Sequence, residues 1–497
     1  MEDNNRYYQS RHFLRLLHRY EKAISEGHVP YLEADELTDI AEYYMTDRQD
    51  DKANQAIKAA IDMHPDSVDP QIFLARQKMF YGKLDEARSI IDSITEQDDL
   101  EVIYIRAELI IKEGHTNEAS KYLFNQMPQM QDSLDTYLYD CTSIFMDYDQ
   151  WGQAEEWLEH LKGAFPDHPR LPIMEAEIKM GLDDYEKAYI LLKEILEAEP
   201  YESEAWDLLA ETCVALEKFP EALEAADYSL AINPKDCTAL LMKANAYMHE
   251  SSMAEAIEHY KQYLELQPDD LSVQISLALC YSSEDRFKEA LSLLEKAEQQ
   301  ALKLPDRDAD LSQVLQLKAY ALGRLDRIPE AITLVEKARE YCDESQAWKC
   351  YMTEGDIYLQ ANQTKLAEDY FTKALEKSPE QGDTLFNIAL SYSNAGYNDV
   401  AIELLDDVWT IFGTQEGKFV VPHLANCYLR KYRESPEKPE HKKDMENFLK
   451  YLQLAPYCDR EATIHLFSDR FPNIAPEDYY AYAFKEYYGF FPKSSVN

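Results

Sequence analysis

The strongest constraint on the fold of this chain is a row of alanines that recurs about every 34 residues. A second row of small residues runs twelve positions ahead of it. Two helices can cross closely only where the side chains at their contact are small, so the two rows predict a series of antiparallel helix pairs. The first row reads Ala53, Ala87, Ala119, Ala154, Ala188, Ala222, Ala256, Ala290, Ala331, Ala367 and Ala401. The second row reads Ala41, Ala75, Ala107, Thr142, Ala176, Ala210, Ala244, Ala278, Ala319, Gly355, Ala389 and Ala425.

One unit of this pattern runs from Ser203 to Pro234. Trp206 and Leu209 share a face of its first helix, Ala222 lies on the second helix, and the proline ends the unit. This resembles the tetratricopeptide repeat, whose pattern is W-x2-L-G-x2-Y, then A-x3-F, then P. The resemblance implies an all-α, right-handed superhelical solenoid of antiparallel helix pairs, with about twelve tandem repeats over residues 34–456. The repeats start near Ala34, Val68, Leu100, Asp135, Pro169, Ser203, Cys237, Leu271, Ser312, Trp348, Gly382 and Lys418.

The segments outside the repeats are expected to cap the two ends of the array, because terminal repeats need a polar outer face. Residues 1–33 predict an N-terminal capping helix that ends at Gly27. Residues 457–497 predict an aromatic C-terminal capping helix and tail, with Pro476 in the first helical turn. That aromatic helix could instead hold a second copy of the chain or a partner. Insertions are expected near residues 302–311 and 431–443, the second as a charged loop.

The charge of the chain is strongly negative, with 94 Asp and Glu against 50 Lys and Arg and a net charge of −44. Nucleic acid and anionic membrane surfaces would be repelled, whereas a basic protein segment would be attracted. The same acidic surface would also keep a large helical protein hydrated, which is the alternative explanation. No apolar stretch is long enough to span a membrane, and the first residues do not resemble a secretory signal. The eight cysteines show no CxxC pair, which favours free thiols in a reducing cytoplasm.

The sequence offers no grouping of residues for catalysis. It has no HExxH, no GxxxxGK[ST], no GxGxxG and no G-x-S-x-G, and its histidines are scattered. The flanking segments of about 33 and 41 residues are too short for an independent catalytic domain. We therefore expect a non-catalytic protein with no cofactor and no metal site.

The resemblance implies that the first helix of each repeat lines a concave groove with positions 5, 9 and 12. Position 9 is acidic in much of the first half, and position 12 is often methionine, which adapts to varied peptides. The alternative is that these side chains only pack the inner helices together. The candidate groove residues are Glu42, Tyr104, Glu108, Tyr139, Met146, Glu177, Met180, Asp207, Glu211, Leu241, Asn245 and Met248.

These features favour a cytoplasmic scaffold or adaptor that binds a protein or peptide segment in the groove. Its partner would carry Lys or Arg and a few apolar anchors. Two other functions stay open at this stage. One is a regulatory sensor that binds a short peptide or small ligand, and the other is an enzyme with a composite site in the groove.

Overall fold

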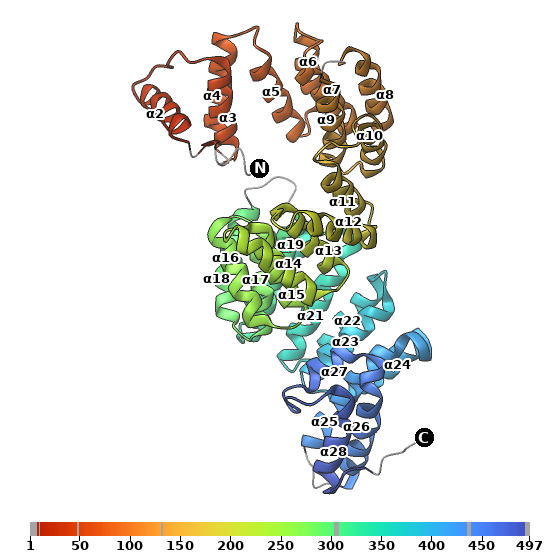
Figure 1. Ribbon diagram of the computed structural model, residues 1–497. Coiled ribbons are helices and arrows are strands. Elements are labelled where there is room, and N and C mark those ends of the chain that lie inside the picture. Colours follow the sequence, from red (N-terminus) through yellow and green to blue (C-terminus); the bar gives the residue numbers. More distant parts are fainter. Residues whose placement is uncertain are drawn as a thin grey trace. The chain divides into compact units, whose positions relative to one another are not determined.

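The computed structural model describes residues 7–8, 10–46, 49–130, 133–302, 308–434 and 439–492. These residues form 27 α-helices, four short 3₁₀ helices and, within the ranges just given, no strand (Figure 1). The chain divides into an N-terminal unit, Met1–Leu216, and a C-terminal unit, Glu217–Asn497. The all-α repeat fold expected from the sequence is therefore confirmed.

The N-terminal unit contains helices α2 to α13. Their bounds are α2 (Arg11–Ser25), α3 (Ala34–Thr46), α4 (Asp50–Met63), α5 (Val68–Phe80), α6 (Leu84–Ser93), α7 (Leu100–Lys112), α8 (Thr116–Gln126), η1 (Met127–Gln129), α9 (Leu134–Asp147), α10 (Trp151–Ala164), α11 (Leu171–Gly181), α12 (Tyr185–Ala198) and α13 (Ser203–Ala215).

The C-terminal unit contains helices α14 to α28. Their bounds are α14 (Phe219–Ile232), α15 (Cys237–His249), α16 (Met253–Leu266), α17 (Leu271–Ser283), α18 (Phe287–Ala301), α19 (Asp308–Arg324), α20 (Ile328–Glu340), η3 (Glu344–Gln346), α21 (Ala347–Gln360), α22 (Thr364–Lys377), α23 (Gln381–Asn394), α24 (Asn398–Glu416), η4 (Gly417–Phe419), α25 (Val420–Glu434), α26 (Pro439–Cys458), α27 (Arg460–Phe467), η5 (Pro476–Asp478) and α28 (Tyr479–Tyr488).

The helix pairs follow the period of the sequence closely. Most first helices begin within two residues of the start read from the sequence, as α5 does at Val68 and α17 at Leu271. Every alanine of the two rows is completely buried, as Ala176 on α11 and Ala188 on α12 illustrate. Within each unit, consecutive helices pack against each other along the chain. The small residues therefore lie at the helix contacts, where their size permits the close crossing.

Gly355 replaces alanine in the second row for a reason of shape. A Cβ atom at this position on α21 would lie 2.4 Å from the ring of Phe371 on α22. Phe371 is itself buried in the core of its repeat. The large ring fills the space that an alanine methyl group occupies elsewhere, so the position requires glycine.

A left-handed residue closes the turn between the two helices of ten successive repeats. Each lies at position 15 of its repeat and has a positive φ, which only glycine adopts without strain. Asp, Asn, Ser and Glu hold most of these positions, and glycine holds three of them. The residues are Gly82, Gly114, Asp149, Asp183, Glu217, Ser251, Asp285, Asp326, Asn362 and Gly396.

Helix α2 covers the first repeat with its apolar face. The hydroxyl of Ser10 accepts a hydrogen bond from the backbone N–H of Phe13 and so begins the helix, and Gly27, with φ +83°, follows its end. Phe13 and Tyr20 are buried in one core with Ile40 of α3. The helix ends at Ser25, two residues before the expected end at Gly27, and residues 1–6 and 9 lie outside the described residues.

The two expected insertions contain more helix than the sequence suggested. Helix α19 begins at Asp308, four residues before the expected repeat start at Ser312, while residues 303–307 lie outside the described part. A charged loop was expected at 431–443, but both ends of this segment are helical. Residues 431–434 belong to α25 and residues 439–443 to α26. Lys431 lies 2.6 Å from Asp399 and 3.5 Å from Asp444, so these ion pairs hold the flanks of this segment in helices. Residues 435–438 are not described.

Two other expectations for the C-terminal end are wrong in detail. The repeats were expected to end at residue 456, but α26 continues through Pro456 to Cys458. A further helix, α27, precedes the aromatic helix α28, which is preceded by a 3₁₀ turn at Pro476. Phe467 of α27 and Tyr479 of α28 are buried against α26. Tyr482, Tyr488, Phe490 and Phe491 stay exposed.

Candidate functional site

The twelve groove candidates fall into two sets, because Leu241, Asn245 and Met248 lie in the C-terminal unit and the others in the N-terminal unit. In the N-terminal unit they lie on the first helices α3, α7, α9, α11 and α13. The polar contacts of this set are most extensive between α5, α7 and α9.

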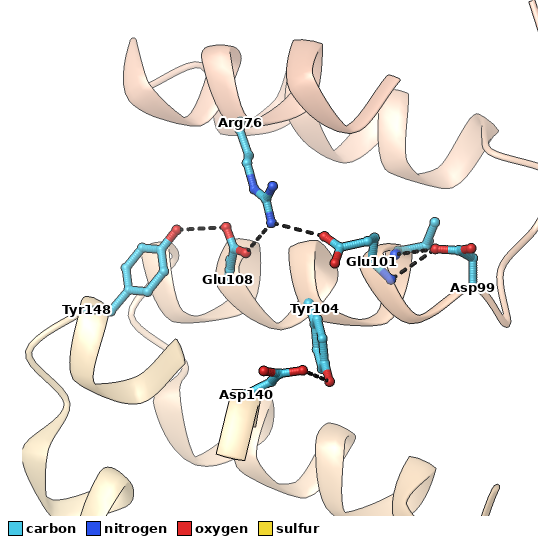
Figure 2. A network of polar contacts seen from close by, with 8 residues as sticks. Arg76, Asp99, Glu101, Tyr104, Glu108, Asp140 and Tyr148 are labelled. Atoms are coloured by element: carbon cyan, nitrogen blue, oxygen red, sulfur yellow. Dashed lines mark hydrogen bonds and ion pairs between the residues drawn. The ribbon is translucent and has the colours of Figure 1, made fainter. Parts of the chain in front are cut away.

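Arg76 of α5 is the centre of a polar network that the sequence reading missed (Figure 2). One guanidinium nitrogen lies 3.0 Å from the Glu108 carboxylate and 3.5 Å from that of Glu101, both on α7. The hydroxyl of Tyr148 donates a second hydrogen bond to Glu108 at 3.1 Å. Asp99 begins α7 by accepting hydrogen bonds from the N–H groups of its first turn. The arginine therefore joins two neighbouring repeats through one nearly buried carboxylate.

The repeat itself explains why these side chains meet. Arg76 and Glu108 both occupy position 9 of their repeats, and so does Glu42 in the repeat before. Stacked repeats place equivalent positions next to each other, which gives the order Glu42, Arg76, Glu108 along the first helices α3, α5 and α7. Reading position 9 as acidic overlooked the arginine between the two acids. The alternation of charge at this position was the feature that could have revealed it.

Tyr104, a groove candidate, is buried rather than open to a partner. It is 5% exposed and stacks on Tyr137 with ring centroids 5.9 Å apart. Its hydroxyl donates a hydrogen bond of 2.8 Å to Asp140 on α9 (Figure 2). Desolvation raises the pKa of Asp140, while this hydrogen bond opposes the shift. Tyr104 therefore packs α7 against α9.

A pocket of about 430 Å³ opens beside the network. Both charged and apolar side chains line it, and Phe80 among them is 69% exposed. The ammonium group of Lys112 lies 5.6 Å from the ring centre of Tyr148, so the phenol ring and the cation interact. The lining residues are Arg76, Met79, Phe80, Glu108, Lys112, Ile144, Asp147 and Tyr148.

A second pocket, of about 220 Å³, shares Arg76 with the first and is strongly acidic. It holds five carboxylates and one arginine beside two apolar side chains. Desolvation raises the pKa of Asp39 and of Glu42, and neighbouring carboxylates add to both shifts. The lining residues are Asp35, Thr38, Asp39, Glu42, Asp69, Ile72, Phe73, Arg76 and Glu101.

The N-terminal segment of the chain contacts two of these acids. The hydroxyl of Tyr7 donates to Asp39 at 2.5 Å, and that of Tyr8 donates to Glu42 at 3.3 Å. Both hydrogen bonds hold the segment against α3. The sequence reading did not assign these tyrosines a role.

Further along the same unit, Glu177 of α11 is half-buried in a negative environment. Its removal from water and the charge of Glu204 raise the pKa of Glu177 to about 7, although Arg170 opposes the shift. Arg170 holds Glu204 with two hydrogen bonds, of 2.5 and 2.7 Å. Glu211 of α13 adds to the negative field. Burial and the neighbouring negative charges therefore favour the protonated form of this glutamate more than water does.

The remaining candidates of this unit have different exposures. Tyr139 stacks on His168 at 5.7 Å and is half-buried. Met146 and Asp207 are also half-buried, Met180 is buried, and Glu211 is exposed. The structure therefore brings Glu42 and Glu108 to the two pockets, and Glu177 and Glu211 into electrostatic reach of each other.

In the C-terminal unit, the three candidates on α15 serve the packing of their own repeat. The side-chain oxygen of Asn245 accepts a 2.7 Å hydrogen bond from Tyr260, whose hydroxyl also lies 3.6 Å from the sulfur of Met248. Leu241 is half-buried against the core of this unit. The Asn245 side-chain oxygen, which could have accepted a hydrogen bond from a partner's backbone, is thus already bonded within the fold.

The C-terminal unit has a pocket of about 300 Å³ that the sequence reading did not identify as a site. Burial raises the pKa of Asp356 in this pocket to about 6, and a hydrogen bond to Ser391 opposes the shift. None of its residues is among the twelve groove candidates, so the repeat pattern gave little indication of this pocket. The lining residues are Tyr320, Arg324, Met352, Asp356, Leu359, Gln360, Asn387, Leu390, Ser391, Asn394 and Ala395.

The described residues contain no group of three or more His, Cys, Asp or Glu placed to hold a metal ion. None of their helices is long and apolar enough to cross a membrane.

Comparison with known proteins identifies the repeat. Models of the tetratricopeptide repeat match residues 208–271, 241–305 and 349–381. No curated protein matches the chain at a significant level.

Several solved structures resemble parts of the chain at low identity. The APC/C hetero-tetramer Cut9–Hcn1 has 14% identity and a TM-score of 0.38, over 83% of this chain and 75% of that one. The human IFIT1 dimer with m7Gppp-AAAA has 18% identity and a TM-score of 0.41, over 75% and 90%. A tetratricopeptide repeat protein from Parabacteroides merdae has 16% identity and a TM-score of 0.39, over 52% and 98%.

Proposed function

Because this chain is a tetratricopeptide-repeat protein, we propose that it is a non-catalytic scaffold or adaptor that binds a segment of a partner protein. The observation that supports this proposal is the pair of pockets that share Arg76 on the N-terminal unit. We call their combined surface the acidic inner face. Its charged residues are Asp35, Asp39, Glu42, Asp69, Arg76, Glu101, Glu108, Lys112 and Asp147.

The acidic inner face suits a segment that is both basic and apolar. Seven carboxylates stand against one arginine and one lysine among its lining residues, so a partner's Lys or Arg would gain favourable charge contacts. Phe80 is exposed among the residues that line the larger pocket, which gives an apolar anchor of the partner a place to pack. The overall charge of −44 would speed the approach of such a segment at low salt.

Three other candidates fit the same proposal as extensions of the binding surface. Glu177, Asp207 and Glu211 would continue the acidic character along α11 and α13. Leu241, Asn245 and Met248 are left out of the proposed surface, because they pack within their own repeat.

The proposal is tested with the full chain and two fluorescent peptides of equal length and equal apolar pattern. One peptide carries lysine and arginine between its apolar residues, and the other carries aspartate and glutamate at the same places. We expect the basic peptide to bind and the acidic one not to bind, with an affinity that falls as salt rises. Charge reversal on the acidic inner face, D39K/D69K, should weaken binding of the basic peptide at least tenfold.

A matched variant separates site binding from general attraction. E156K/E159K makes the same change in net charge on the exposed face of α10. If both double variants lose affinity equally, the attraction comes from the overall charge and the proposed site is wrong. Capture from the native lysate with the wild type and D39K/D69K would then identify the natural partner of the site. A response to a small metabolite, with no protein partner captured from the lysate, would favour the sensor function instead.

A further inference from the structure

Two cysteines of the C-terminal unit lie in direct contact. The sulfur atoms of Cys342 and Cys350 are 3.9 Å apart, and the residues are eight positions apart in the chain. Cys342 lies in the short connection between α20 and η3, and Cys350 lies in the first turn of α21. This contact plays no part in the acidic inner face, which belongs to the N-terminal unit.

The two thiols have different surroundings. Cys350 is fully buried, with 0% of its surface exposed, and a hydrogen bond connects it to Ser312 of α19. Cys342 is half-buried and its thiol lies 3.6 Å from the carbonyl oxygen of Arg339. An oxidant in solution can therefore reach Cys342 but not Cys350.

We propose that Cys342 and Cys350 form a reversible intramolecular disulfide. A disulfide needs its sulfur atoms about 2.05 Å apart, so the pair must close by roughly 2 Å. Cys350 is held in a helix, but Cys342 lies outside regular helix, in a bend that can rotate its side chain toward its neighbour. Disulfides in reducing compartments are mostly transient and redox-sensing, and such a disulfide agrees with an exposed and a buried thiol placed side by side.

The oxidant for this step is a low-molecular-weight disulfide such as oxidised glutathione. The Cys342 thiolate attacks one sulfur of the oxidant, forms a mixed disulfide and releases one glutathione thiolate. Cys350 then attacks the Cys342 sulfur, and the second glutathione leaves as a thiolate that takes up the proton released from Cys350. Two protein thiols are oxidised and one glutathione disulfide is reduced to two thiols, so the step is balanced.

The bond would fasten the end of one repeat to the first helix of the next. Arg339, three residues before Cys342, pairs with Glu354 of α21 at 2.5 Å, and Glu354 is only 1% exposed. The same helix carries Met352 and Asp356 of the pocket in this unit. The disulfide would add a covalent link to a junction that an ion pair already joins.

The test uses the full chain, reduced and then incubated with oxidised glutathione. Free thiols are blocked, the protein is digested with trypsin, and the peptides are analysed by mass spectrometry. Cleavage after Arg339, Lys349 and Lys365 separates the two cysteines onto different peptides. We expect these two peptides to be joined in most molecules, and dithiothreitol to release them.

Two variants define the order of the reaction. C350A should keep glutathione on Cys342, because no second thiol can displace it. C342S should leave Cys350 unmodified, because its sulfur is buried. C237S, which removes a partly exposed cysteine of another repeat, should form the bond as the wild type does, and circular dichroism checks that all three variants fold. The proposal is overturned if the wild type also keeps glutathione on Cys342, if neither cysteine reacts, or if Cys342 joins a different cysteine.

Discussion

The guanidinium group of Arg76 lies 3.0 Å from the carboxylate of Glu108, across the junction between the second and third repeats (Figure 2). Glu108 is 8% exposed, so its hydrogen-bond donors come from the protein rather than from water. Arg76 and Tyr148 together supply the donors. The contact therefore stabilises the stacking of two repeats and also forms the wall of the larger pocket.

Removing Arg76 should destabilise the N-terminal unit. In R76A, Glu108 keeps the hydrogen bond from Tyr148 but loses its counter-charge, which should cost about 1–2 kcal/mol. Urea unfolding followed by circular dichroism measures the change. R76A/E108Q should recover part of the loss, because the buried charge is removed with its partner. The exposed pair of Arg88 and Glu113 gives the control, since R88A should lower the free energy of unfolding by less than about 0.5 kcal/mol. Equal losses of stability in R76A and R88A would contradict the role given to Glu108.

Glu177 should make the stability of the protein depend on pH. Its pKa is about 7 in the folded chain and 4.5 as the ordinary value, so the folded state holds more protons between these two pH values. Stability should therefore fall as pH rises from about 4.5 to 7 and then stay level with respect to this group. E177Q should remove the effect and be more stable than the wild type above pH 7, by at most about 3 kcal/mol. Urea midpoints at four pH values test this, and an unchanged difference between the two proteins across the range would contradict it. E159Q, an exposed acid on α10, is the control.

The left-handed turn residues should respond in opposite directions to glycine and alanine. Ser251 has φ +59°, and S251G should stabilise the chain by up to about 1 kcal/mol because glycine relieves the backbone strain. Gly114 has φ +84° and open space around it, so G114A should cost about 1 kcal/mol through strain alone. Thermal unfolding of both variants measures the two signs. If S251G were less stable than the wild type, the contacts of the Ser251 side chain would contribute more to stability than the relief of backbone strain does.

Gly355 should not tolerate even a methyl group. G355A would bring Cβ to 2.4 Å from the Phe371 ring, and displacing that buried ring should cost about 1–3 kcal/mol. A smaller side chain at the partner, in G355A/F371L, should restore part of the stability. G152A is the control on helix α10, where nothing lies within 4 Å of the new atom and helix propensity favours alanine. Calorimetry measures the unfolding temperature of the three variants. If G355A were as stable as G152A, the Phe371 ring would be free to move aside.

The fold could be read from the sequence because its main determinant is local and repeated. A small side chain at a helix crossing is needed in every repeat, so Ala188 or Ala222 is recognised by its spacing alone. The left-handed turns were harder to see, because Gly82, Asp183 and Ser251 share a backbone conformation but not a residue type.

The candidate site could be read only in part. Spacing indicates which side of a helix a residue lies on, but it does not reveal which neighbour satisfies it. Tyr104 was expected in the groove, yet Asp140 and Tyr137 bury it between two helices. The role of Arg76 depends on Glu108 and Tyr148 in other repeats, and the pairing of Cys342 with Cys350 depends on the bend between α20 and η3.

The ten left-handed residues have a consequence for how such a chain can change its length. Each lies at the same position of its repeat, and every repeat packs against the repeats before and after it through equivalent surfaces. If the residues between two successive left-handed positions were deleted, the helices on either side of the deletion could still pack as neighbouring helices of one repeat. The loss of a single residue would instead shift the register of every contact that follows it. The natural step of growth or shortening for this protein is thus one whole helix pair.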